Sequence, residues 1–165
     1  MGSSQLYSAH VRPLLEYGLP VAYPQSKGER VSLERVQRRG TKMVQNMYHL
    51  AYDERRGLLN LHPLEFRRVR YDLLTTRRIL LGQYGTDLLR FFTLVGESRT
   101  RGHELKLQKP RRLKLGANST LSTRVVNLWN ALPPELLAIQ SELQFKDALD
   151  AHLWRHWDEC SGAVQ

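Results

Sequence analysis

The 165-residue sequence has little cysteine and no long apolar run, and each shortage excludes a class of protein. Cys160 is the single cysteine, so an internal disulfide cannot form, and a reducing intracellular compartment is expected. No apolar stretch is close to the length of about 18 residues that a helix needs to cross a bilayer. Residues 1–7 lack the basic start and apolar core of a secretory signal. The sequence therefore predicts no membrane partner.

Motifs that build catalytic sites are also absent. The sequence has no adjacent pair of aspartates, no glycine-rich phosphate loop, no nucleophile elbow and no Cys-x-x-Cys pair. A two-metal nucleotidyl-transfer site needs clustered carboxylates. Asp147 and Asp150, three residues apart on one expected helix, are better explained as a solvated surface. We therefore expect no catalytic residue and no cofactor in this chain.

One group of metal-ligating residues has helical spacing. His152, His156 and Cys160 lie four residues apart, so a continuous helix would project them from one face. Zinc usually recruits a fourth ligand, and no fourth residue fits the pattern of known structural sites. Packing at the end of a helix beside Trp154 and Trp157 is the favoured interpretation, and no metal site is predicted.

The charge of the chain is strongly positive and unevenly distributed. Lysine and arginine total 25 against 16 acidic residues, a net charge of +9. Residues 1–124 carry 23 basic and 10 acidic residues, whereas residues 125–165 carry two basic and six acidic residues. Nineteen of the basic residues are arginine, which suits phosphate contact. A polyanion is the partner that this composition favours.

The hydrophobic pattern predicts a mainly α-helical fold, a bundle-like helical region followed by a small β-hairpin and two C-terminal helices. Residues 1–95 are expected to form a basic helical region and residues 96–165 the hairpin and C-terminal helices, although the two could pack as one domain. A short apolar segment is expected at residues 88–95. The expected helices cover residues 6–17 (interrupted at Pro13), 29–47, 52–59, 63–81, 121–130 and 141–157.

The helix at residues 29–47 is predicted to be amphipathic with a basic outer face. Its apolar positions are Leu33, Val36, Met43, Val44 and Met47. On the opposite side lie Arg35, Arg38, Arg39 and Lys42.

The helix at residues 63–81 carries two kinds of arginine. Arg70 and Arg77 lie at the border of its apolar stripe, so we expect them to be partly buried ion-pair residues. Arg67, Arg68 and Arg78 are the better surface candidates.

Residues 104–107 and 112–115 alternate polar and apolar side chains as half-buried strands do. Residues 108–111 separate them, so a small hairpin is plausible, with Pro110 outside central pairing. This region adds further basic residues in loops.

Phosphate binding needs many cations on one side of the molecule, and each neutralised phosphate adds salt-sensitive affinity. The competing interpretation is an ordinary solvated helix face. The arginine-rich excess favours nucleic-acid contact. The candidate binding residues are Arg35, Arg38, Arg39, Lys42, Arg67, Arg68, Arg78, Arg99, Arg101, Lys109, Arg111 and Arg112.

Six ordered blocks of this sequence resemble the region that follows the polymerase core in non-LTR (LINE-type, jockey-like) retrotransposon reverse transcriptases. The resemblance extends from about Leu6 to Trp154, with Tyr23 in place of an expected tryptophan and Arg56 in place of a common leucine. The blocks are residues 7–18 (YSAHVRPLLEYG), 33–42 (LERVQRRGTK), 52–56 (YDERR), 64–73 (LEFRRVRYDL), 98–103 (SRTRGH) and 124–133 (RVVNLWNALP), followed by Phe145-Lys146.

The resemblance implies a thumb-like and C-terminal region of an RNA-directed DNA polymerase that makes cDNA by target-primed reverse transcription. The fingers, the palm with its paired aspartates and Mg²⁺, and the endonuclease of such elements would lie upstream of Met1. The implied role is non-catalytic binding of a template-primer, as RNA, DNA or an RNA–DNA hybrid, in the nucleus. There are two alternatives. The chain could be a protein-interaction or folding-support module that docks on the missing polymerase core, or a remnant with no present role.

Overall fold

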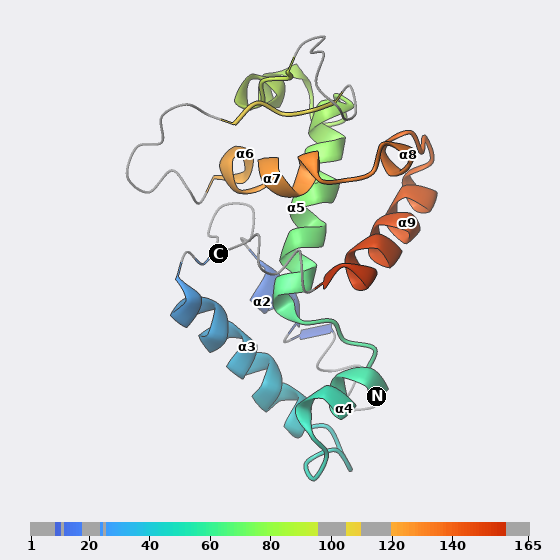
Figure 1. Cartoon of the computed structure of the whole chain (residues 1–165). Coiled ribbons are helices and arrows are strands. Elements are labelled where there is room, and N and C mark those ends of the chain that lie inside the picture. The colour runs from blue at the N-terminus through green and yellow to red at the C-terminus, as the bar shows by residue number, and fades with distance from the viewer. Residues whose placement is uncertain are drawn as a thin grey trace. The chain divides into compact units, whose positions relative to one another are not determined.

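The computed structural model describes residues 9–10, 12–17, 24, 26–95, 105–109 and 120–157, and within these the chain is mainly helical. It divides into two compact units, Met1–Arg68 and Val69–Gln165. The elements are α2 (Arg12–Glu16), α3 (Lys27–Lys42), α4 (Tyr52–Leu58), α5 (Leu64–Leu80), the 3₁₀ helix η2 (Thr86–Phe91), α6 (Leu121–Arg124), α7 (Val126–Asn130), α8 (Pro134–Leu137) and α9 (Glu142–Arg155) (Figure 1).

Local sequence signals account for most helix boundaries. Ser26 caps α3: its hydroxyl accepts from the Glu29 N–H, and the Glu29 carboxylate accepts from the Ser26 N–H, both at 3.1 Å. Asn60 and Gly82, with φ of 50° and 71°, follow α4 and α5 in the left-handed conformation that commonly ends helices. Pro13 lies in the first turn of α2, where its missing N–H costs nothing.

Two predicted helices differ from the observed ones in extent. α3 ends at Lys42 instead of Met47, and the chain then turns through Asn46 at a φ of 63°. The helix predicted at residues 121–130 is two short helices, α6 and α7, that meet at Val125.

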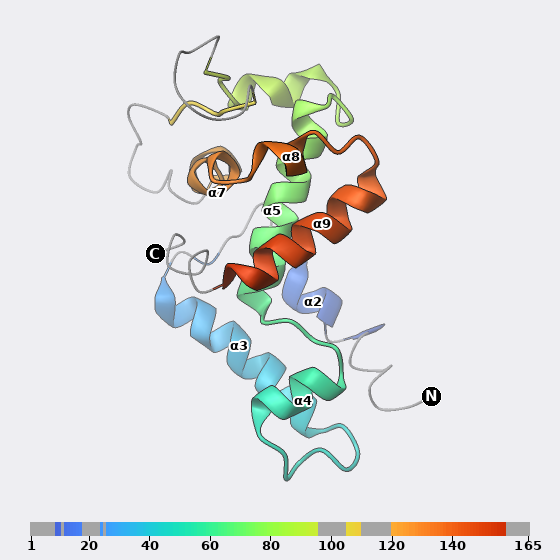
Figure 2. The same ribbon diagram turned by 45° about the vertical axis from the view of Figure 1, so that its right-hand side comes forward.

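The second unit has a conventional apolar core. The part of α5 that lies in this unit is joined to α9 by the ion pairs Arg70–Asp150 and Arg78–Glu142, and both views show α9 beside α5 (Figures 1 and 2). Asp72 on α5 and Arg124 on α6 form a buried ion pair with contacts of 2.7 and 2.8 Å. The most buried apolar side chains are Val69, Leu73, Leu107, Val125, Val126, Trp129, Phe145, Leu149 and Leu153.

The predicted β-hairpin is not seen among the described residues. Leu107 instead forms an isolated antiparallel bridge with Leu94, through hydrogen bonds from Val95 N to Lys106 O and from Gln108 N to Thr93 O. The amide group of Asn130 bonds both the N–H and the C=O of Leu107 at 2.9 Å. The backbone hydrogen-bonding groups on both sides of the chain at Leu107 therefore have partners. Residues 110–119, which include the second predicted strand, lie outside the described residues.

The contacts at Leu107 also bear on how the chain divides into compact units. The sequence placed a boundary near residue 95, but Leu94 pairs with Leu107 inside one unit, and Trp129 Nε1 donates to Leu105 O at 2.8 Å. The observed units meet between Arg68 and Val69, within α5. In the part of the chain that the structure describes, no helix has the length and apolar character needed to span a bilayer.

Candidate nucleic-acid interface

The outer face of α3 carries four basic side chains. Arg35, Arg38, Arg39 and Lys42 follow one another at helical spacing and are all exposed. Because a helix advances about 100° per residue, Arg35, Arg39 and Lys42 point away from the buried Gln37 and Thr41, and Arg38 lies at the flank between the two sides. We call these four residues the α3 basic face. Its place on the helix agrees with the sequence prediction.

The buried side of α3 was predicted less well. The sequence placed Val36 and Met43 on an apolar inner face, but they are 44% and 84% exposed. The most buried side chains of α3 are instead Gln37 and Thr41, at 1% and 0% exposure. Polar contacts, not a hydrophobic stripe, therefore attach this helix to its neighbours.

Glu34, Gln37 and Tyr52 form the centre of that polar attachment. The Tyr52 hydroxyl donates to Glu34 at 2.5 Å and accepts from Gln37 Nε2 at 2.9 Å. Gln37 also donates to the His62 carbonyl at 3.1 Å, and Glu34 accepts from the Leu64 N–H at 2.9 Å. Burial and the hydrogen bond to Glu34 raise the pKa of Tyr52, so its hydroxyl stays protonated and remains a donor. α3, α4 and the start of α5 are thus held in a fixed arrangement.

Arg55 is a buried arginine that the sequence did not identify. Its side chain is 1% exposed and donates to the carbonyls of Leu50 and Arg38 and, at 3.2 Å, to the Thr41 hydroxyl. The last carbonyls of a helix carry partial negative charge, so a cation beside the end of α3 is stabilised there. Arg55 and the neighbouring Arg56 differ in burial because only Arg55 lies between the end of α3 and the Leu50 carbonyl.

Arg38 has a further contact that fixes part of its orientation. Its guanidinium lies 4.8 Å from the centre of the Tyr52 ring, within the range of a cation–π interaction. Asp53 lies near this end of the basic face. The hydrogen bond from Arg56, at 2.5 Å, and then the charges of Arg56 and Arg38, lower the pKa of Asp53. Asp53 is therefore ionised at neutral pH and offsets part of the positive charge.

The remaining candidate residues differ in exposure and in their place in the chain. The prediction that Arg68 lies at the surface was wrong: it is 2% exposed and pairs with Glu65 at 2.9 Å. Arg67 is half-buried, and Arg78 is ion-paired with Glu142 in the second unit. Lys109, also in the second unit, is exposed. Outside the described residues lie Arg99, Arg101, Arg111 and Arg112.

Arg70 and Arg77 lie as their border position suggested, but with different partners. Arg70 is half-buried and forms an ion pair with Asp150, as predicted. Arg77 is 6% exposed, but it donates to the carbonyls of Ile139 and Gln140 instead of a carboxylate. The burial of both arginines was predictable from their place beside the apolar stripe. The partners of Arg77 were not, because they belong to the loop before α9.

Possible metal ligands are sparse in the described part of the chain. No group of three or more histidine, cysteine or carboxylate side chains there has the arrangement of a metal site. The rings of His152 and His156 lie 4.9 Å apart at the end of α9, and Cys160 is outside the described residues.

Comparison with protein-family models, with curated proteins and with solved structures finds no match to this chain.

Proposed function

We propose that the chain binds the phosphate backbone of a nucleic acid through the α3 basic face, without reading its sequence. The observation that carries this proposal is the exposure of Arg35, Arg38, Arg39 and Lys42 on one side of a helix whose other side is firmly attached. Because the backbone of α3 is already fixed, these cations can meet several phosphates together with little further loss of backbone freedom.

The local electrostatics support this assignment. The carboxylates nearest the face have other partners: Glu29 caps α3, Glu34 accepts from Tyr52 and Leu64, and Asp53 accepts from Arg56. Arg39 and Lys42 lie in the last turn of α3, where they also stabilise the helix end. That contribution needs only one or two cations, whereas the face carries four.

The resemblance to non-LTR reverse transcriptases supports a particular kind of ligand. In this proposal the chain is the non-catalytic, thumb-like C-terminal part of an RNA-directed DNA polymerase, acting in the nucleus. It would hold the template-primer, while Mg²⁺ and the chemistry belong to the palm of the parent enzyme. Of the possible ligands, an RNA–DNA hybrid is the first to test.

Fluorescence anisotropy with a labelled RNA–DNA hybrid at low salt tests the proposal directly. The double variant Arg38→Glu with Arg39→Glu should weaken binding at least about tenfold, because two phosphate contacts become repulsions.

The matched control is Arg90→Glu with Arg155→Glu. Both arginines are exposed, both lie in the second unit, and the change in net charge is the same. Binding by this control should be close to that of the unchanged chain. Equal losses in the two double variants would show that total charge, and not the α3 basic face, governs binding.

A second function is favoured by exposed apolar side chains on α9. Leu143 and Trp154 are 69% and 57% exposed, which suits docking of this helix on the polymerase core of the parent enzyme. Co-purification with that core should be lost in a Leu143→Glu, Trp154→Glu variant. Undiminished co-purification would contradict docking through α9 and leave nucleic-acid binding untouched.

A further inference from the structure

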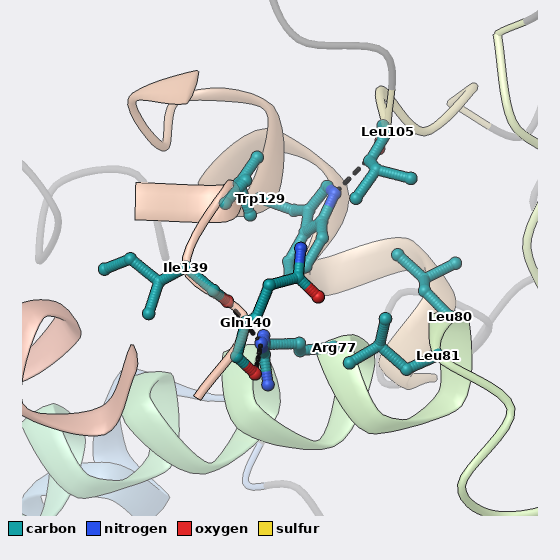
Figure 3. A pocket seen from close by; sticks show the side chains of 8 residues that line it. Arg77, Leu80, Leu81, Leu105, Trp129, Ile139 and Gln140 are labelled. Atoms are coloured by element: carbon teal, nitrogen blue, oxygen red, sulfur yellow. Dashed lines mark hydrogen bonds between the residues drawn. The ribbon is translucent and has the colours of Figure 1, made fainter. Parts of the chain in front are cut away.

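The second unit contains a cavity of about 110 Å³ beside the C-terminal end of α5. Its wall is mainly aliphatic and aromatic, with one charged side chain, Arg77. Figure 3 shows Arg77 reaching from α5 to the carbonyl oxygens of Ile139 and Gln140. The other lining residues are Leu80, Leu81, Leu105, Trp129 and Leu137.

Arg77 is a buried cation held mainly by neutral groups. Nη2 donates to Ile139 O at 2.6 Å and to Gln140 O at 3.1 Å, and the guanidinium lies 4.4 Å from the centre of the Phe145 ring. Nε and Nη1 make no hydrogen bond with the described residues. Burial lowers the pKa of Arg77, which reports the cost of keeping its charge in this environment.

The neighbouring arginines of the second unit have carboxylate partners. Arg70 pairs with Asp150, Arg78 with Glu142, and Arg124 with Asp72. No carboxylate among the described residues lies within ion-pair distance of Arg77. The charge of Glu142 reaches Arg77, but Arg78 and Lys146 already bond that carboxylate. Arg77 therefore retains an unmet preference for an anion.

We propose that this cavity binds a small apolar monocarboxylate, with its carboxylate on Arg77 and its hydrocarbon part among Leu80, Leu81 and Trp129. A charge-assisted hydrogen bond is strong where water is scarce, and the apolar wall gains from covering an aliphatic group. The volume suits a short branched acid such as 3-methylbutanoate.

Two-dimensional ¹H–¹⁵N NMR of the full chain at neutral pH tests this inference. The indole N–H of Trp129 should shift and saturate with 3-methylbutanoate. The uncharged isostere 3-methylbutanamide should bind at least about tenfold more weakly, since it lacks the anion. Arg77→Met should abolish the saturable shift.

Because Arg77→Met also frees two carbonyls and could disturb folding, a second variant leaves Arg77 in place. Leu81→Trp should block the cavity, because Leu81 is a half-exposed lining residue whose larger replacement can occupy the same space. Arg90→Met removes one exposed cation of the same unit and should leave binding unchanged. The inference is overturned by equal binding of acid and amide, by no saturable shift, or by retained binding in Leu81→Trp.

Discussion

At the scale of single residues, arginines of the same chemical type have opposite roles. Arg55 is buried and bonds the end of α3, whereas Arg35 is exposed on the outer face of the same helix. A guanidinium in water contributes little to stability, but a buried one that satisfies carbonyls contributes much more. Stability and binding should therefore be separable by mutation.

Arg55→Met should lower the free energy of unfolding by about 3 kcal/mol, because it leaves the Leu50 and Arg38 carbonyls without this donor. Urea unfolding followed by circular dichroism measures the change. Arg35→Met is the matched control and should change stability by less than about 0.5 kcal/mol while weakening hybrid binding. Equal stability of the two variants would contradict the structural role of Arg55.

Glu142 should give the second unit an acid-sensitive contribution to stability. Hydrogen bonds from Arg78 and then Lys146 lower the pKa of Glu142 from its ordinary 4.5 to about 2. Because the folded state favours the ionised form, this contribution is complete above about pH 4.5 and falls as the pH drops towards 2. Glu142 is partly exposed, so solvent screening keeps the effect modest.

Urea unfolding as a function of pH measures this linkage. In Glu142→Gln the loss of stability below about pH 4.5 should be shallower than in the unchanged chain, because the shifted carboxyl is gone. Identical acid dependence would show that the Arg78–Glu142 pair contributes nothing to it.

At the scale of elements, short sequence signals decide where helices begin and end, and polar contacts decide how α3 is attached. The capping box at Ser26 and Glu29 starts α3, and Gly82 ends α5 in a left-handed turn. By contrast, α3 packs through Gln37 and Thr41. A helix held this way has few apolar contacts, so its own propensity matters more than that of a core helix.

Gly28→Ala should therefore stabilise the fold by about 0.5–1 kcal/mol. Gly28 lies in the first turn of α3, and an added Cβ would meet only Ser26 Oγ at 3.8 Å, an ordinary contact. The gain comes from fewer conformations of the unfolded chain and is measured as a higher urea midpoint.

Gly82→Ala is the control of opposite sign. Gly82 has open space around it but a φ of +71°, so alanine should destabilise the fold by about 1 kcal/mol through backbone strain alone. A gain at both positions would mean that the left-handed end of α5 is not required.

At the scale of the whole molecule, the chain has many more basic residues than the four that are proposed to contact phosphates. Many arginines that contribute to the +9 net charge are engaged elsewhere: Arg68 with Glu65, Arg70 with Asp150, and Arg124 with Asp72. The α3 basic face retains four exposed cations. The affinity for a nucleic acid should therefore depend on these four cations and not on the net charge of the chain.

The salt dependence of hybrid binding measures that number. Four phosphate contacts predict a slope of about −4 in a plot of log affinity against log salt, and Arg38→Glu with Arg39→Glu should make the slope shallower by about 2. A slope that is unchanged in this variant would place the phosphate contacts on other residues.

Much of the secondary structure could be predicted from the sequence, because its signals are local. Helical spacing located α4, α5 and α9, and it placed Arg35, Arg38, Arg39 and Lys42 on one face of α3. These inferences need only the geometry of one helix.

The tertiary structure decided which of the arginines are available and how the chain pairs at Leu107. Arg55 and Arg68 are buried because helix ends and Glu65 lie beside them, and Arg77 is enclosed by the loop before α9. Leu107 bonds Asn130 and bridges to Leu94, so its edges are filled by residues far away in sequence. By itself the sequence determined where α4, α5 and α9 lie and which side of α3 is basic, because these follow from neighbouring residues. Burial and partners depend on which distant segments meet, and that information arises only when the chain is folded.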